Sequence, residues 1–264
     1  MSIFDLFTLR ISLKLQMAVT HLSEKLDGYR VDRFNPNCEL EPLEQEIAVV
    51  EDALKALQAA GVLPHTQYDH EKMLAHRRAV VDLFEIPWTS VSLRAQRLIY
   101  AINAIVQPQI MIAAGIFCGN TFISNAGAAA GPGACYTAQQ LIGVEIKPEE
   151  AERAERNVRR IDPTGIAKIV CDDAVHFVGQ FIEPIDLLYL DAVDMNDRRS
   201  KSLYLEILEA AYVRIPPGGV VVAHNSVDYA EELSDYLAFV RDSKNFRKSV
   251  NAILDTQGLE VSLK

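Results

Sequence analysis

The hydrophobic positions divide the chain into two parts with different periodicities. Through residue 88, apolar side chains recur at helical spacing without strand-like alternation, which predicts amphipathic helices. Beyond residue 88, short apolar runs alternate with amphipathic stretches, which predicts strands that alternate with helices. We therefore predict an N-terminal helical extension over residues 1–88 and an α/β domain over residues 89–264.

The extension is expected to hold three helices, over Phe4–Lys25, Pro42–Ala60 and Tyr68–Phe84. Gly61 ends the second helix and Pro87 follows the third, as is common after helix ends.

The alternating region predicts a doubly wound sheet, mostly parallel, with helices on both faces and right-handed crossovers. A short turn with Gly258 separates the final two strands, which predicts an antiparallel hairpin. Strands are expected at Gln109–Ala114, Leu141–Ile146, Ala167–Cys171, Ile185–Asp191, Val220–His224, Phe246–Leu254 and Leu259–Leu263. Helices are expected at Leu93–Val106, Asn120–Ala130, Pro148–Arg160, Asp173–Phe181, Ser200–Arg214 and Tyr229–Asp242.

Composition narrows the class of protein. The 264 residues are 49% hydrophobic, enough for a sizeable core. A net charge of −10 disfavours phosphate backbones, so we expect no nucleic acid partner. Four scattered cysteines without a CxxC pair indicate free thiols in a reducing compartment. No signal peptide and no apolar run of the ~18 residues that a membrane span needs is found, which predicts a soluble cytoplasmic protein.

The most informative stretch lies where the first predicted strand ends. Its apolar run stops at Gly115, and Gly119 follows at the start of a helix. Without Cβ atoms, these positions let a nucleotide-like ligand approach the backbone. The helix start, capped by Asn120 or Thr121, offers N–H groups to a carboxylate. The alternative is a tight strand–helix turn that binds nothing.

Carboxylates follow the next two predicted strands. Glu145 can accept hydrogen bonds from ribose hydroxyls, or it is a surface acid that starts a loop. Of Asp172 and Asp173, one is expected to cap the following helix. The other is then free to accept a hydrogen bond from the exocyclic amine of a base.

Asp191 ends the fourth strand, and His224 and Asn225 end the fifth. These three side chains could share one divalent cation. His224 could also serve as a general base, because the pKa of a free histidine is close to neutrality. The alternatives are a core histidine bonded to backbone for His224 and a helix cap for Asn225.

The order of these motifs resembles the class I S-adenosylmethionine-dependent methyltransferases, most closely the branch of catechol and caffeoyl-CoA O-methyltransferases. The segment Gly-Ile-Phe-Cys-Gly-Asn-Thr from Gly115 is similar to that branch's Gly-x-Tyr-Cys-Gly-Tyr-Ser loop. Thr89-Ser90 resembles the loop that folds over the methionine end of the cofactor. The resemblance covers residues 89–264 and implies a Rossmann-like fold with a seven-stranded sheet. It implies that S-adenosylmethionine is bound by Ser90, Gly115, Phe117, Gly119, Thr121, Glu145, Ile146, Asp172, Asp173 and Asp191.

The same resemblance gives Asp191, His224 and Asn225 the metal-binding and catalytic positions that face the acceptor. Three departures accompany it. Ala113 stands where relatives carry an acid, and His224 replaces the aspartate of an Asp-Asn pair. Asp194 occupies the place of a lysine base. The three possible metal ligands Asp191, His224 and Asn225 suit a cation softer than magnesium, or no metal.

We therefore expect methyl transfer from S-adenosylmethionine to a small-molecule acceptor. The extension would be a lid or dimer element that shapes the acceptor pocket, with a homodimer as one expectation. Two alternatives remain open: transfer of the aminocarboxypropyl arm or cyclisation with release of methylthioadenosine, and a non-catalytic binding protein of this fold. Aromatic residues that could line the pocket, or simply pack, are Phe4, Phe7, Tyr29, Phe34 and Trp88.

Overall fold

The computed structural model describes Tyr29, residues 31–192 and residues 200–264. The predicted helix Phe4–Lys25, with Phe4 and Phe7, and Asp194 lie outside these residues. The strands are β1 (Ile110–Ala114), β2 (Gln140–Glu145), β3 (Ala167–Cys171), β4 (Leu187–Leu190), β5 (Val220–His224), β6 (Lys248–Ala252) and β7 (Leu259–Leu263).

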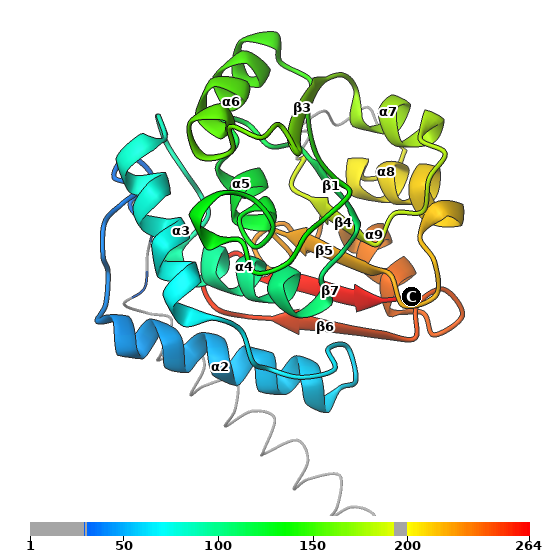
Figure 1. The fold of residues 1–264 in the computed structure, drawn as a ribbon. Helices are drawn as coiled ribbons and strands as arrows, with labels where there is room; N and C mark the ends of the chain where they lie inside the picture. Colours follow the sequence, from blue (N-terminus) through cyan, green and yellow to red (C-terminus); the bar gives the residue numbers. More distant parts are fainter. Residues whose placement is uncertain (1–28, 30, 193–199) are drawn as a thin grey trace, which may run out of the picture.

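These strands form one seven-stranded sheet in the order β3-β2-β1-β4-β5-β7-β6 (Figure 1). Neighbours from β3 to β5 pair in parallel, and β7 runs antiparallel to both β5 and β6. The predicted doubly wound sheet with an antiparallel C-terminal strand is confirmed. Because the strand order reverses between β1 and β4, their carboxyl ends flank the crevice in which such sheets bind ligands.

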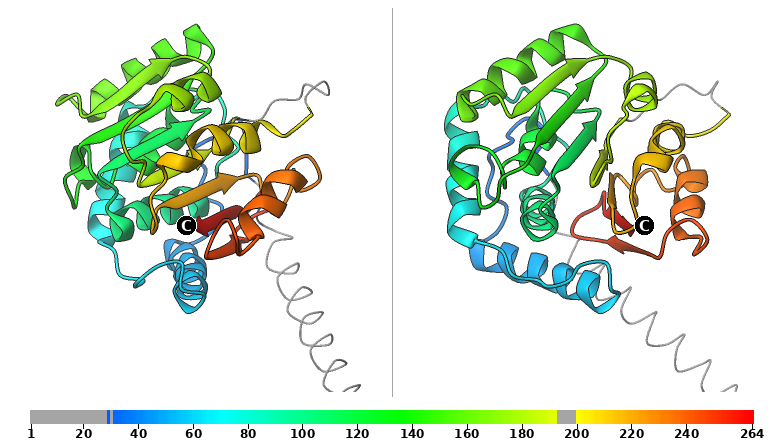
Figure 2. Two further views of the ribbon diagram at one scale, coloured as in Figure 1. Left: turned by 90° about the vertical axis from the view of Figure 1, so that its right-hand side faces the viewer. Right: turned by 45° about the vertical axis from the view of Figure 1, so that its right-hand side comes forward.

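Helices cover both faces of the sheet (Figure 2). Along β1, Met111 and Ala113 face one layer, whereas Ile112 and Ala114 face the other, and all four are fully buried. In the described ranges, none of the helices has the length and apolar character to cross a membrane. One layer contains α2 (Leu43–Ala59), α3 (His70–Leu83), α4 (Leu93–Val106), α5 (Asn120–Ala126) and α6 (Pro148–Ile161), and the other contains α7 (Ala174–Gln180), α8 (Leu203–Ala211) and α9 (Ser234–Arg241).

A buried carboxylate joins the helices of the extension to the α/β domain. Glu46 of α2 accepts hydrogen bonds from Arg77 of α3 at 2.8 Å and from Arg97 of α4 at 2.5 Å. Burial would raise the pKa of Glu46, but the two guanidinium groups outweigh it and hold this pKa below its usual value. The helices α2 and α3 thus pack as part of one molecule with the sheet, and the division at residue 88 stays a prediction.

Some helix boundaries differ from the predicted ones for local reasons. The hydroxyl of Ser202 accepts from the N–H of Leu205 at 3.3 Å, so α8 begins after this cap rather than at Ser200. The predicted helix Tyr229–Asp242 begins only at Ser234, because turns occupy the residues before it.

Candidate functional site

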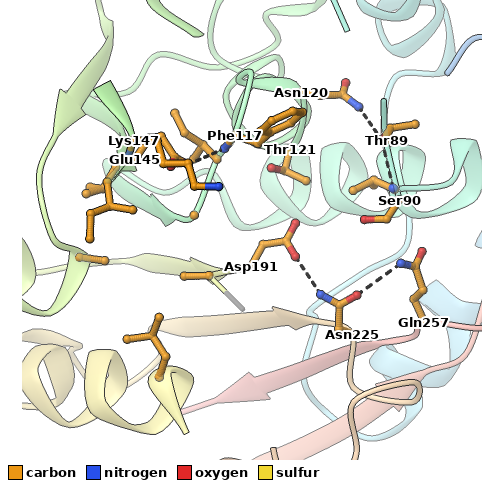
Figure 3. A pocket seen from close by; sticks show the side chains of 18 of the residues that line it. Thr89, Ser90, Phe117, Asn120, Thr121, Glu145, Lys147, Asp191, Asn225 and Gln257 are labelled. Atoms are coloured by element: carbon orange, nitrogen blue, oxygen red, sulfur yellow. Dashed lines mark hydrogen bonds between the residues drawn. The ribbon is translucent and has the colours of Figure 1, made fainter. Parts of the chain in front are cut away.

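A cavity of about 580 Å³ opens at the carboxyl ends of β1, β2, β4 and β5. This volume is in the range of small-molecule sites. Glu145 lies at one end of the cavity, Asp191 in the middle, and Ser90 with Gln257 at the other end (Figure 3). Most of the predicted site residues line it, namely Ser90, Gly115, Phe117, Thr121, Glu145, Ile146, Asp172, Asp173, Asp191 and Asn225.

The two glycines of the loop after β1 have different surroundings. Gly115 lines the cavity with φ at +77°, and a Cβ atom there would lie 2.5 Å from the Cα of Ala192. Gly119 does not line the cavity. Its φ is +91°, and its Cβ position faces the side chain of Ala154 at 3.2 Å. Gly115 therefore lets the loops after β1 and β4 meet at the cavity, while Gly119 lets the turn pack against α6.

Glu145 organises the glycine loop from the end of β2. One carboxylate oxygen accepts from the N–H of Phe117 at 2.8 Å and the other from the N–H of Lys147 at 3.0 Å. Phe117, held by the first of these bonds, has a left-handed conformation with φ at +49°. An ionised carboxylate has about four lone-pair sites. Glu145 therefore keeps the capacity to accept hydrogen bonds from the hydroxyls of a ligand.

The two aspartates after β3 have separate tasks. Asp173 caps α7, because its Oδ1 accepts from the N–H of His176 at 3.0 Å. Asp172 faces the ring of His176, with 2.9 Å between Oδ2 and Nδ1. This hydrogen bond lowers the pKa of Asp172. Asp172 therefore presents a charged carboxylate at the end of the cavity where Glu145 lies.

Asp191, His224 and Asn225 lie together, as the sequence predicts. Nδ1 of His224 lies 3.1 Å from Oδ1 of Asp191, and Nδ2 of Asn225 donates to the same oxygen at 3.0 Å. His224 is fully buried and does not line the cavity. Its burial lowers its pKa, but the Asp191 carboxylate outweighs burial and raises the pKa above the usual value. Because the ring is buried outside the cavity lining and its Nδ1 faces Asp191, this geometry does not present His224 to an acceptor, and its general-base role stays a prediction.

The same contacts test the predicted metal site. Both His224 and Asn225 turn nitrogen donors towards Asp191, and the side-chain oxygen of Asn225 accepts from Gln257 at 3.3 Å. Among the residues that the structure describes, no group of three His, Cys, Asp or Glu side chains could hold a metal ion. In this geometry the three side chains hydrogen-bond to one another instead of converging on a cation, and we derive no step through one.

Several lining residues were not predicted from the sequence as site residues. Trp88, expected only as an aromatic that could line the acceptor pocket, does line the cavity, with its ring 4.7 Å from the ring of Phe117. Tyr29 instead lies buried under the guanidinium of Arg94, and Phe34 is 83% exposed. The additional lining residues include Arg33, Asn120, Lys147, Asp228, Tyr229 and Gln257.

Comparisons with known proteins agree with this geometry. Residues 112–226 match the sequence model of a family described as a methyltransferase domain. The fold is similar to that of an O-methyltransferase from Bacillus cereus solved in complex with SAH, with a TM-score of 0.55 and 14% identity. That match covers 81% of this chain and 100% of the other. The chain has the fold of the class I S-adenosylmethionine-dependent methyltransferases.

Two further solved methyltransferases have similar folds. SAH-bound PaMTH1 from Podospora anserina has a TM-score of 0.56 and 12% identity, over 86% of this chain and 99% of that one. The O-methyltransferase TomG from Streptomyces achromogenes, solved with SAM, has a TM-score of 0.53 and 16% identity, over 75% and 91% of the two chains. No curated protein matches this sequence. The predicted resemblance to this class of methyltransferase is confirmed.

Proposed function

We propose that this chain is an enzyme that transfers the methyl group of S-adenosylmethionine to a small-molecule acceptor. The observation that carries the proposal is that Gly115 and Glu145 line the same cavity. The glycine brings bare backbone to the crevice between β1 and β4, and the carboxylate beside it has acceptor capacity for two vicinal hydroxyls.

The other lining residues suit the same cofactor. Asp172 offers an acceptor for an exocyclic amine at the Glu145 end of the cavity. Asp191, in the middle, offers negative charge to a positively charged sulfur. Five lining side chains are acidic and two are basic, which favours a cationic ligand: Glu145, Asp172, Asp173, Asp191 and Asp228 against Arg33 and Lys147.

When bound, the cofactor supplies a methyl group on a sulfonium, which an acceptor can displace in line. The protein then has to align the acceptor and exclude water. Trp88 and Phe117 offer apolar surface for this purpose. Partial desolvation at the cavity wall raises the pKa of Asp228, which makes it a stronger base than an ordinary carboxylate and a candidate for taking the acceptor's proton.

Titration calorimetry with S-adenosylhomocysteine tests the cofactor site. We expect the wild type to bind, and Glu145→Gln to bind about 10- to 100-fold more weakly, because a hydrogen bond to a charged group contributes roughly 1.5–3 kcal/mol. Glu183→Gln, at a carboxylate that does not line the cavity, should bind like the wild type. A wild-type protein that binds no S-adenosylhomocysteine contradicts the proposal.

The reaction is tested by incubating the protein with S-adenosylmethionine and a panel of small acceptors. Formation of S-adenosylhomocysteine, detected by mass spectrometry, is the expected result. Methylthioadenosine as the product would favour transfer of the aminocarboxypropyl arm or cyclisation instead. Binding without any turnover would favour a non-catalytic protein. A cytoplasmic location, a homodimer and the lack of a nucleic acid partner stay predictions from the sequence.

A further inference from the structure

The turn between β6 and β7 forms one wall of the cavity through Gln257. This side chain lines the cavity and is only 6% exposed. The carbonyl of Gln257 accepts from the N–H of Val227, in the loop after β5, at 2.8 Å. At Gly258, whose φ is +70°, a Cβ atom would lie 2.6 Å from the side chain of Val227. The turn and the loop after β5 are therefore in close contact.

The backbone of this turn is fixed on its other side by Asp255. One oxygen of this buried carboxylate accepts from the N–H groups of Gln257 at 2.9 Å and of Gly258 at 3.1 Å. The other oxygen accepts from the hydroxyl of Ser92, the N-cap of α4. Since hydrogen bonds hold the backbone of Gln257 from both sides, the Cα position of this residue is fixed.

Gln257 reaches Asp191 through one intermediate amide (Figure 3). Its Nε2 donates to Oδ1 of Asn225 at 3.3 Å, and Nδ2 of Asn225 donates to Asp191 at 3.0 Å. An amide has its acceptor on one side and its donors on the other. The carboxylate of Asp191 can only accept, so the NH₂ group of Asn225 faces it, and Gln257 holds the amide of Asn225 from the other side by donating to its oxygen.

We propose that Gln257 is a positioning residue, which fixes the amide of Asn225 so that Asp191 presents its carboxylate to the middle of the cavity. This inference rests on the proposed function, in which the sulfonium of the cofactor lies beside Asp191. Gln257 comes from the turn of a hairpin more than sixty positions beyond Asp191 in the chain.

S-adenosylmethionine and S-adenosylhomocysteine report on this arrangement. The two molecules share adenosine and the aminocarboxypropyl arm, but only the former has a positive charge on sulfur. The ratio of their dissociation constants therefore measures the charge that the protein presents to the sulfur atom. A merely structural role of Gln257 would weaken the binding of both molecules alike.

The experiment measures both dissociation constants by calorimetry for the full chain and for Gln257→Met, which keeps the length of the side chain without its amide. We expect binding of S-adenosylhomocysteine to stay within about twofold, and preference for S-adenosylmethionine to fall about two- to tenfold, the loss from one neutral hydrogen bond. In an Asp191→Asn background, Gln257→Met should leave the ratio unchanged, because the carboxylate through which it acts is gone.

Ser226→Ala is the matched control. The hydroxyl of Ser226 donates to Oδ1 of Asn251 at 2.9 Å, so this variant also removes one hydrogen bond between the loop after β5 and the hairpin. It should leave the ratio unchanged. The inference is overturned if Ser226→Ala shifts the ratio as much as Gln257→Met, or if Gln257→Met shifts it equally with and without Asp191. A wild type that binds neither molecule overturns the proposed function together with this inference.

Discussion

Gly115 is the residue on which the shape of the cavity depends most directly. Its α-carbon faces the backbone of Ala192, directly after Asp191, so the loops after β1 and β4 meet at this position. Backbone cannot move aside as the end of a flexible side chain can. A single added carbon would therefore separate two loops that both line the cavity.

Replacing Gly115 by alanine should abolish binding of S-adenosylhomocysteine and lower the free energy of unfolding. The left-handed φ costs about 1–2 kcal/mol for a side chain, and the collision with Ala192 adds about 1–3 kcal/mol. Gly61→Ala is the control, because Gly61 has the same φ of +77° but no atom within 4 Å of its Cβ position. Calorimetry and urea unfolding measure both effects. Wild-type binding by Gly115→Ala would contradict this account.

The sequence predicts residues at the ends of parallel strands well, because each strand brings its end to the same edge of the sheet. Glu145, Asp172 and Asp191 all line the cavity for this reason. At β5 the position at the strand end is not enough, because alternation along the strand decides which face of the sheet a side chain joins. His224 alternates with Val220 and Val222 on one buried face of the strand and does not line the cavity. Gln257 comes from a hairpin turn, which the ends of parallel strands do not indicate.

At the scale of elements, the start of α4 and the β6–β7 turn support each other. Ser92 accepts from the N–H of Ala95 at 3.0 Å as the N-cap of α4, and its hydroxyl donates to Asp255. Arg94, the second residue of the helix, donates to the carbonyl of Leu254 at 2.8 Å. The loop that contains Thr89 and Ser90 is therefore joined to the turn that carries Gln257.

Ser92→Ala should lower the free energy of unfolding by about 2–4 kcal/mol, measured by urea unfolding. About 1 kcal/mol is the lost helix cap, and roughly 1–3 kcal/mol is the unsatisfied oxygen of buried Asp255. Ser202→Ala removes the cap of α8 without a buried carboxylate, so it should cost only about 1 kcal/mol. Equal losses in the two variants would mean that the contact with Asp255 contributes little.

Elements whose ends carry strong local signals were predicted to the residue. The bounds of α4, β3, β5 and β7 in the structure equal the predicted ones, because apolar runs there stop at polar or turn-forming residues. The start of α9 was missed by five residues. The turns before it carry apolar and acidic residues at spacings that also suit a helix, so local pattern alone could not exclude one.

At the scale of the whole molecule, a buried histidine of α3 packs this helix against α4 and the segment after α5. His76 is 3% exposed, stacks on Tyr100 at 5.7 Å between ring centres, and leaves no room for a Cβ at Gly127 or Gly133. The sequence predicted the helices of the extension, but periodicity identifies only an apolar face and not its partner. It therefore could not show that α2 and α3 cover the same sheet face as α4.

Burial of His76 predicts a sensitivity to acid. Desolvation lowers its pKa from 6.5 to about 4. Between these two pH values the unfolded chain binds one more proton, so the contribution to stability is complete above about pH 6.5 and is lost as the pH falls towards 4. The loss is about 3 kcal/mol, from 1.36 kcal/mol per pKa unit.

Urea unfolding between about pH 4 and pH 7 measures this contribution. His76→Met should reduce the fall in stability over this range, whereas His176→Gln, at an exposed histidine, should not. An unchanged pH dependence for His76→Met would show that the histidine is already neutralised in the unfolded chain or charged in the folded one.

The position of β7 between β5 and β6 has a consequence for synthesis on the ribosome. A nascent chain that has emerged through β5 can pair all five parallel strands, but the hydrogen-bonding edge of β5 then has no neighbour until β7 emerges. Such an edge is a template for pairing with other chains. Stop codons or frameshifts between β5 and β7 should therefore yield aggregating fragments, and a protein whose cavity also lacks the wall that Gln257 provides.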